Sequence, residues 1–356
     1  MRFIKKLIMT MIGCLGLISL SYAGENLFYA LRSDDPSQIT SMQNTLASLK
    51  NHYKSIDIIV SQAYQIDQNG MFWGYVDPEL KSFAKSHSMK LMVLITNAGF
   101  DKEKTHKFLV NESAQQRAIQ SILTACEKNH FYGVQFDFEM IPFVDRDVLT
   151  HFYVTATEAL HKKGLIVSYA IAPLVGENPQ ASAYLKKLYT VWEGAYDLKA
   201  LSKSADFLTI MAYNQHGEGT TPGATAGAPW VEQTIKYTLQ YVPAAKLSLG
   251  IATYSMYWFT AGSPSSKIYM HATDIAYDKA IYLLEKYHAT FRWDDVEKVN
   301  YAIYDHNWLN EYIFAEDAKS FRAKLDLVKK YNLRGISVFD LGIEDPKIWD
   351  ELAGKA

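Results

Sequence analysis

Three polar side chains at alternate positions, Gln135, Asp137 and Glu139, are candidates for chemistry because the residues between them are phenylalanines. Side chains alternate between the two faces of a β-strand, so the segment 131–140 places the polar row on one face and an apolar row on the other. Two carboxyl groups this close on one face influence each other, and at neutral pH one tends to keep a proton. The pair therefore predicts an acid and an orienting base.

The alternative for this polar row is structural: a strand end whose carboxyl groups meet solvent or pair with lysine and arginine. Burying three polar side chains in a bulky apolar strand costs free energy unless they are used. The functional explanation is therefore favoured.

Short apolar runs alternate with longer amphipathic segments along the whole chain, of which 115–128 and 148–162 predict helices. This alternation is typical of a parallel sheet covered by helices. Eight repeats predict an α/β fold of the (β/α)8 or TIM barrel type, with Glu139 at the carboxyl end of the fourth strand, where barrel active sites lie. The predicted strands are 27–31, 56–60, 91–96, 133–138, 166–172, 207–211, 247–252 and 336–339.

The chain is longer than the roughly 250 residues of a plain barrel, and the surplus lies between the seventh and eighth strands. Residues 254–304 contain a helix-like segment, 276–287, and strand-like pieces near Phe291 and Tyr301. They predict a small α+β insertion. A doubly wound open sheet is the alternative, but no glycine-rich phosphate loop is present to occupy its switch-point crevice.

The composition excludes several classes of protein. The 356 residues include 36 Lys and Arg against 38 Asp and Glu, a net charge of −2 without basic blocks, which argues against nucleic-acid binding. The 10 histidines are not spaced as metal ligands, so we expect neither a metal nor another cofactor. We expect a monomer.

The N-terminal residues 1–23 predict a secretory signal peptide. Three basic residues precede an apolar run, 7–20, which ends before Ser-Tyr-Ala, a small-x-small cleavage signal. The run is too short to span a membrane, and no later stretch is as apolar, so no transmembrane span is expected after its removal. A lipid anchor at Cys14 is the alternative. The expected organisation is an exported chain with one catalytic barrel over 24–356.

The polar row resembles the signature of glycoside hydrolase family 18, D-G-h-D-h-D-h-E with h apolar, on the fourth strand of a (β/α)8 barrel. Residues 211–214, Met-Ala-Tyr-Asn, resemble the family's M-x-Y-D at the end of the sixth strand, and 335–346 resemble its eighth strand. The blocks are most similar to those of the bacterial branch that includes spore-cortex-lytic N-acetylglucosaminidases. The resemblance covers nearly the whole chain after residue 23.

The resemblance implies an exported retaining glycosidase that hydrolyses β-1,4 linkages after N-acetylglucosamine in peptidoglycan or chitin-type chains. In this family the acetamido group of the substrate is the nucleophile. The implied catalytic residues are Glu139 as general acid and base, Asp137 and Tyr213. The implied substrate-binding residues are Gln135, Met211, Asn214, His216 and Phe339. The alternative is a chitinase-like carbohydrate-binding protein without activity, because a fold does not fix an activity.

Several positions depart from the family pattern. Tyr132 and Gln135 replace the two leading acidic residues of the signature, Asn214 replaces an acidic residue, and Phe339 replaces the tryptophan that usually floors the reacting subsite. Phenylalanine still offers a flat apolar face, with less area and no indole N–H. Further aromatic residues on expected loops are candidates either for sugar stacking or for packing: Trp230, Tyr254, Tyr257 and Trp258.

Overall fold

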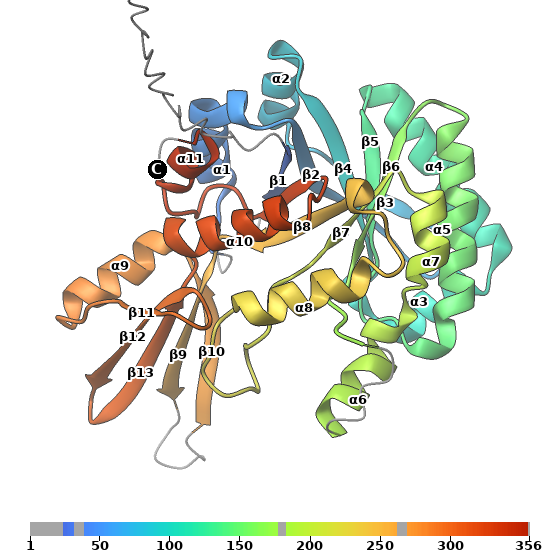
Figure 1. Ribbon diagram of the computed structural model, residues 1–356. Coiled ribbons are helices and arrows are strands. Elements are labelled where there is room, and N and C mark those ends of the chain that lie inside the picture. The colour runs from blue at the N-terminus through green and yellow to red at the C-terminus, as the bar shows by residue number, and fades with distance from the viewer. Residues whose placement is uncertain (1–23, 32–38, 177–182, 262–268, 355–356) are drawn as a thin grey trace, which may run out of the picture.

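The computed structural model describes residues 24–31, 39–176, 183–261 and 269–354 (Figure 1). Eight parallel strands form its centre, close to the ranges predicted from the sequence. They are β1 (Glu25–Leu31), β2 (Ile58–Ile66), β4 (Lys90–Asn97), β5 (Gly133–Asp137), β6 (Ile166–Ile171), β7 (Phe207–Ile210), β8 (Leu247–Ala252) and β14 (Gly335–Phe339).

The eight strands close into a barrel. Each pairs in parallel with its neighbours in the order β1-β14-β8-β7-β6-β5-β4-β2, and β2 returns to β1. A short strand, β3 (Phe72–Gly74), adds antiparallel to β2. The predicted (β/α)8 barrel is therefore confirmed.

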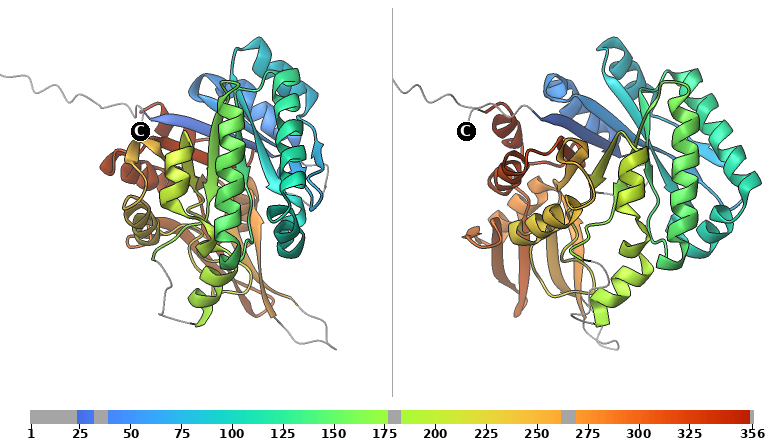
Figure 2. Two further views of the ribbon diagram at one scale, coloured as in Figure 1. Left: turned by 90° about the vertical axis from the view of Figure 1, so that its right-hand side faces the viewer. Right: turned by 45° about the vertical axis from the view of Figure 1, so that its right-hand side comes forward.

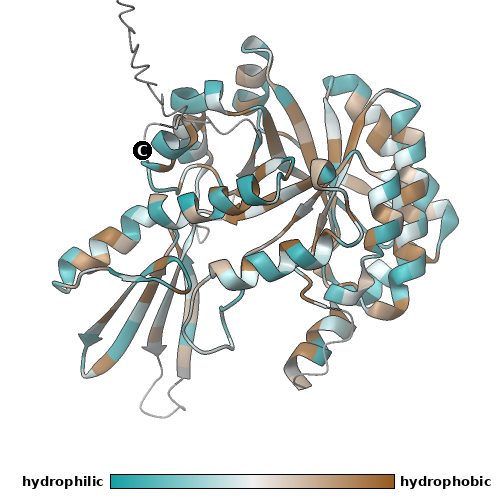
Figure 3. Ribbon diagram, viewed as in Figure 1, coloured by the Kyte–Doolittle hydropathy of each residue, from teal (hydrophilic) through white to brown (hydrophobic). Residues whose placement is uncertain are grey.

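Alternation along each strand divides the apolar side chains between two layers. In β1, Leu27 and Tyr29 point into the barrel, where they pack with apolar side chains from other strands. Phe28 and Ala30 point outward into the larger core between strands and helices. Figure 3 shows brown, hydrophobic segments on the barrel strands and on the helices around them, which also carry teal, hydrophilic segments. Burial of both strand faces explains why these strands read as nearly continuous apolar runs.

Helices cover the outside of the barrel (Figure 2). The two predicted from the sequence are present, and α4 begins at Glu112 because the Asn111 side chain accepts a hydrogen bond from Ala114 N at 3.1 Å. The helices are α1 (Met42–His52), α2 (Pro78–Ser86), α3 (Lys102–Leu109), α4 (Glu112–Asn129), α5 (Arg146–His161), α6 (Ala183–Val191), α7 (Leu198–Ser204), α8 (Ala228–Thr238), α10 (Ala318–Lys330) and α11 (Ile348–Leu352).

A second, antiparallel sheet lies between β8 and β14 in the chain and beside the barrel in space (Figure 1). The predicted helix 276–287 is α9, and the strand-like pieces near Phe291 and Tyr301 are β11 and β12. The sheet extends beyond the expected range 254–304, because the strand after β12 pairs with both β12 and β9. The elements are β9 (Ser255–Ala261), β10 (Tyr269–Ile275), α9 (Tyr277–Lys286), β11 (Arg292–Asp294), β12 (Val299–His306) and β13 (Leu309–Ala315).

The expected signal peptide, 1–23, and Cys14 within it lie outside the described residues. Within the described part of the chain, no helix combines the length and the apolar character needed to cross a bilayer.

Candidate active site

A cavity of about 200 Å³ opens at the carboxyl ends of the barrel strands. Asp137 is the last residue of β5, Phe339 is the last residue of β14, and Met211 directly follows β7. We call this space the Glu139 cavity. The described residues that line it are Gln62, Phe100, Asp137, Glu139, Trp192, Met211, Tyr213, Asn214, Tyr254, Asp274 and Phe339.

The backbone of Glu139 is fixed although β5 has already ended. Glu139 N donates to Asn97 Oδ1 at 3.0 Å, and Asn97 Nδ2 donates to Glu139 O at 3.0 Å and to Thr105 Oγ1 at 2.9 Å. Met140 then takes a positive φ of 56°, which turns the chain away from the barrel. Asn97 is the last residue of the neighbouring strand β4, so the end of that strand holds the backbone of Glu139 in place.

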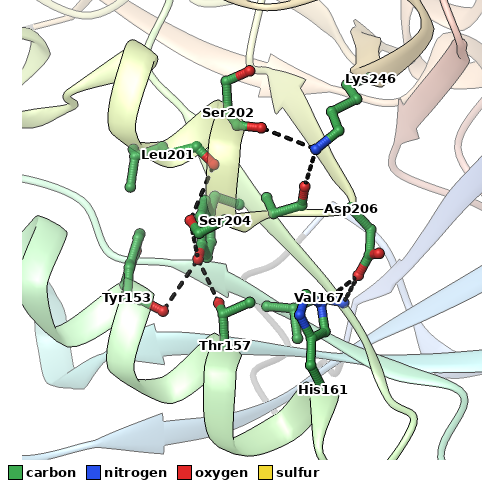
Figure 4. A network of polar contacts seen from close by, with 11 residues as sticks. Tyr153, Thr157, His161, Val167, Leu201, Ser202, Ser204, Asp206 and Lys246 are labelled. Carbon is green, nitrogen blue, oxygen red and sulfur yellow. Dashed lines mark hydrogen bonds and ion pairs between the residues drawn. The ribbon is translucent and has the colours of Figure 1, made fainter.

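The peptide before Glu139 is held from the other side by two tyrosines. Phe138 N donates to Tyr153 OH at 3.1 Å, and Tyr196 OH donates to Phe138 O at 2.8 Å. Tyr153 lies on α5, and its carbonyl accepts from Tyr169 OH at 3.1 Å in a buried polar network (Figure 4). Tyr169 OH also lies 3.1 Å from Ser204 Oγ on α7. The helices behind the barrel therefore help to set the position of the segment that carries Glu139.

Burial controls the electrostatics of the two carboxyl groups. Asp137 is 7% exposed, and its Oδ1 atom has no hydrogen-bond partner. Loss of solvation raises the pKa of Asp137, and it raises the pKa of Glu139 as well. The negative charge of Asp137 raises the pKa of Glu139 further. Glu139 therefore keeps its proton at pH values where an ordinary glutamic acid has lost it.

Aromatic side chains form one wall of the cavity. Tyr213 stacks on Phe339, with ring centroids 5.6 Å apart and an interplanar angle of 19°. Tyr254 OH donates to Asn214 Oδ1 at 2.5 Å, which holds the side chain of Asn214 against the wall. Burial raises the pKa of Tyr213 well above its ordinary value, so its phenol remains a hydrogen-bond donor.

Gln135 and His216 are not among the described residues that line the Glu139 cavity. Gln135 is fully buried below it, where it accepts from Tyr29 OH at 2.5 Å and donates to Thr209 Oγ1 at 3.2 Å. His216 Nδ1 lies 3.1 Å from Thr221 O in the loop after β7. Gln135 thus belongs to a buried polar network inside the barrel, and His216 belongs to the loop after β7.

Sequence reasoning missed several residues of the site, because they come from separate strands and loops with no shared spacing. Gln62, Phe100, Trp192 and Asp274 line the cavity, and Asn97, Tyr153 and Tyr196 position the backbone. Phe100 and Trp192 are aromatic, and that was the one sequence feature that could have marked them as candidates for sugar stacking. Of the four aromatic residues considered for stacking, Tyr254 lines the cavity, Trp258 is buried within the second sheet, Tyr257 contacts Glu311, and Trp230 packs against the main core.

A metal site is not evident in this part of the chain. Across the described residues, no three His, Cys, Asp or Glu side chains are grouped so as to hold an ion. The chemistry available at the Glu139 cavity is acid–base chemistry by a carboxyl pair beside an aromatic wall.

Known proteins share both sequence and fold with this chain. The sequence is 28% identical over 294 residues to the cortical fragment-lytic enzyme of Bacillus subtilis (strain 168), covering 81% of this chain and 65% of that enzyme. The chain thus spans just under two thirds of the length of that relative. It is 24% identical over 308 residues to an uncharacterized glycosylase of the same organism, YvbX, with 85% of each chain covered.

Solved structures have the same fold. The spore cortex-lytic enzyme SleL of Bacillus megaterium superposes with a TM-score of 0.80 at 24% identity, covering 93% of this chain and 74% of that one. A chitinase of Chromobacterium violaceum gives a TM-score of 0.79 at 24% identity, covering 94% and 99%. The family pattern described as glycosyl hydrolases family 18 matches residues 28–344. The resemblance and the glycoside hydrolase class inferred from the sequence are confirmed: the chain belongs to glycosyl hydrolases family 18.

Proposed function

We propose that this protein is a retaining glycosidase that cleaves β-1,4 linkages after N-acetylglucosamine in peptidoglycan or chitin-type chains. The observation that carries the proposal is the pairing of Asp137 with Glu139 in one cavity, where burial and mutual charge raise the pKa of Glu139. A carboxyl group that keeps its proton near neutral pH is suited to act as a general acid.

In the first step, Glu139 donates its proton to the glycosidic oxygen, and the bond from that oxygen to the anomeric carbon breaks. The carbonyl oxygen of the 2-acetamido group forms a new bond to the same carbon, which gives an oxazolinium ion. Asp137 orients the acetamido N–H and stabilises the positive charge that develops on the ring. Tyr213 donates a hydrogen bond to the acetamido carbonyl.

In the second step, the ionised Glu139 takes a proton from water, and the water oxygen attacks the anomeric carbon. The bond to the acetamido oxygen breaks, and the two inversions leave the original configuration. The nucleophile is carried by the substrate, so the gain from intramolecular attack depends on how firmly the cavity orients the acetamido group. The hydrogen bonds to Asn97, Tyr153 and Tyr196 fix the backbone of the two residues that follow Asp137.

The departures from the family pattern adjust the binding of the sugar. Asn214 offers a neutral amide where the family has a charge, and its oxygen is already engaged by Tyr254. Phe339 stacks on Tyr213 and presents a smaller flat surface to a sugar ring than tryptophan does. Met211 supplies an apolar edge of the same cavity. We infer weaker sugar stacking with the acid–base pair intact.

We also propose export by the segment 1–23, with cleavage after Ala23 and without a lipid anchor at Cys14. The basic, apolar and small-residue regions of a secretory signal follow one another there. N-terminal sequencing of the protein recovered from its producing cells tests this. A mature chain beginning at Gly24 supports the proposal, whereas a lipid-modified cysteine at the N-terminus overturns it.

Product analysis tests the activity. Purified protein is offered N-acetylglucosamine oligosaccharides and peptidoglycan in parallel, and the products are identified by mass spectrometry. Proton NMR of the first product follows the anomeric configuration. We expect fragments with N-acetylglucosamine at the new reducing end, released initially in the β configuration.

Two variants control this experiment. Glu139→Gln keeps the size of the side chain but cannot donate a proton, so we expect turnover to fall by about 10²–10⁴-fold. Glu158→Gln changes an exposed glutamate on the outer surface of α5 and should retain full turnover. Equal turnover by Glu139→Gln and the unaltered protein contradicts the mechanism. Sugar binding without any cleavage identifies a carbohydrate-binding protein instead.

A further inference from the structure

A second cavity, of about 380 Å³, adjoins the Glu139 cavity. The two share four lining residues: Gln62, Tyr254, Asp274 and Phe339. The second cavity does not include Asp137 or Glu139 among its described lining residues, so it lies on the side of Phe339 away from the general acid. We call it the Asp340 cavity.

Asp340 is the unusual residue of this cavity. It is 1% exposed, and neither of its carboxyl oxygens has a hydrogen-bond partner. The backbone around it is well fixed, because Thr253 Oγ1 donates to Asp340 O at 2.5 Å and Leu341 N donates to Tyr29 O at 3.0 Å. A buried polar group that lacks a partner costs free energy, which indicates that a ligand completes its hydrogen bonding.

Among the described residues, the charged groups that influence Asp340 are carboxyl groups. Asp274, on β10, lines the same cavity, and the carboxyl group of Glu344 lies close enough to influence Asp340. Burial raises the pKa of Asp340 to about 8 and that of Asp274 to about 6, and the nearby carboxyl groups add to the shift of Asp340. No lysine, arginine or histidine is found among the described residues that line either cavity. The complementary ligand group is therefore a cation.

We propose that Asp340 and Asp274 form a subsite for the ammonium group of a glucosamine unit, so that the enzyme acts preferentially on partly de-N-acetylated glycans. The proposal rests on the proposed function, and it requires that a glycan held in the Glu139 cavity extend into the Asp340 cavity, which shares lining residues with it. A primary ammonium group offers three N–H donors, and the unpartnered oxygens of Asp340 are acceptors for them. An acetylated unit brings one N–H and no charge.

Across the residues that the structure describes, no three His, Cys, Asp or Glu side chains are grouped so as to hold a metal ion. Tyr254 lies near the carboxyl groups of both cavities, because burial raises the pKa of its phenol and Asp274, Asp340 and Glu139 all raise it further. The position of the ammonium group next to the reacting ring, rather than on it, leaves the acetamido nucleophile in place.

Binding measurements test the proposal without turnover. The Glu139→Gln variant is titrated by calorimetry with the trisaccharide glucosamine–N-acetylglucosamine–N-acetylglucosamine and with its fully acetylated counterpart. Because hydrogen bonds to charged groups are stronger than neutral ones, we expect about tenfold tighter binding of the glucosamine trisaccharide at low salt. Buffers of different ionisation enthalpy should reveal proton release, since the ammonium group favours the ionised form of Asp340.

Three further variants decide the outcome. Asp340→Asn and Asp274→Asn, each added to Glu139→Gln, should abolish the preference and the proton release. Asp326→Asn, on the exposed surface of α10, should change neither. If Asp340→Asn does not fold, Asp274→Asn gives the answer. Equal binding of the two trisaccharides, or a preference that survives both substitutions, overturns the subsite. A chain with Glu139 intact that cleaves no glycan overturns only the proposed function.

Discussion

Buried carboxyl groups occur at two places in this molecule, at the start of α10 and at the mouth of the barrel, and their hydrogen-bond partners differ. At the start of α10, Glu316 accepts from Lys324 Nζ at 2.6 Å and from Ser320 Oγ at 2.9 Å, and the side chains of Glu316 and Lys324 are 3% and 2% exposed. At the mouth of the barrel, Asp137 Oδ1 and both oxygens of Asp340 have no partner. The residue type and the burial are alike, but only the first group is neutralised.

The difference separates structural from functional use of the same chemistry. The buried Glu316 carboxyl group is paired with a lysine and a hydroxyl group at the start of α10. Carboxyl groups without a hydrogen-bond partner or a counter-charge raise one another's pKa and remain available to a ligand. Their burial lowers the stability of the fold. Substitutions in the two groups should therefore have opposite effects on folding.

The largest effect is expected from Lys324→Met. It leaves the charge of Glu316 buried and unpaired, so the free energy of unfolding should fall by about 3–5 kcal/mol. Urea denaturation measures the change. Lys330→Met on the same helix is the matched control, because its partner Glu232 lies at 2.6 Å in a pair whose lysine is 59% exposed. That control should lose about 1 kcal/mol or less. Equal losses of unfolding free energy in the two variants would contradict the difference between the buried and the exposed ion pair.

Asp137→Asn should affect catalysis rather than stability. Loss of a group that stabilises developing charge lowers kcat by about 10²–10³-fold. The negative charge of Asp137 raises the pKa of Glu139, so its removal lowers that pKa. The acid must be protonated to act, so the basic limb of the pH–rate profile should move to lower pH. An unchanged basic limb shows that another group controls it.

Asp340→Asn should stabilise the protein in a pH-dependent way. Burial raises the pKa of Asp340 to about 8 in the folded state, whereas an unfolded aspartate has a pKa of about 3.9. The folded state therefore holds the proton more tightly, and stability is lost as pH rises through this window. The variant should gain on the order of 2 kcal/mol at pH 8 and nothing near pH 4. Urea denaturation at both pH values measures the free energy of unfolding. A less stable variant at pH 8 would contradict the difference between the two sets of buried carboxyl groups.

The last substitution, Tyr153→Phe, tests the support of the segment that carries Glu139. It removes the acceptor of Phe138 N behind the catalytic loop, at 3.1 Å, without touching substrate. We expect a loss of about 1–3 kcal/mol in unfolding free energy and a fall in kcat larger than any change in KM. Tyr282→Phe, on the exposed surface of α9, should change neither quantity. A change in KM alone would indicate that Tyr153 does not position the acid.

The sequence by itself determined the barrel and the placement of Asp137 and Glu139 on one face of its fourth strand. The apolar runs have the period and length of buried parallel strands, and the alternation along 131–140 places Asp137 and Glu139 on one face wherever that strand lies. Local rules suffice for these two features, because each depends on neighbours in the chain. Tyr213, by contrast, was indicated by the resemblance of residues 211–214 to the family's M-x-Y-D motif.

Only the tertiary structure decided how the site is supported and how it extends. The backbone of Phe138 and Glu139 is held by three residues that are far apart in the chain, Asn97, Tyr153 and Tyr196. Their spacing in the sequence does not indicate that they lie together. The meeting of Asp340 with Asp274 likewise depends on the docking of β10 against the end of β14. Gln135 shares the polar row of its strand, yet the depth of the barrel places it below the cavity. Closure of the sheet sets these distances, because it joins residues that are far apart in the chain.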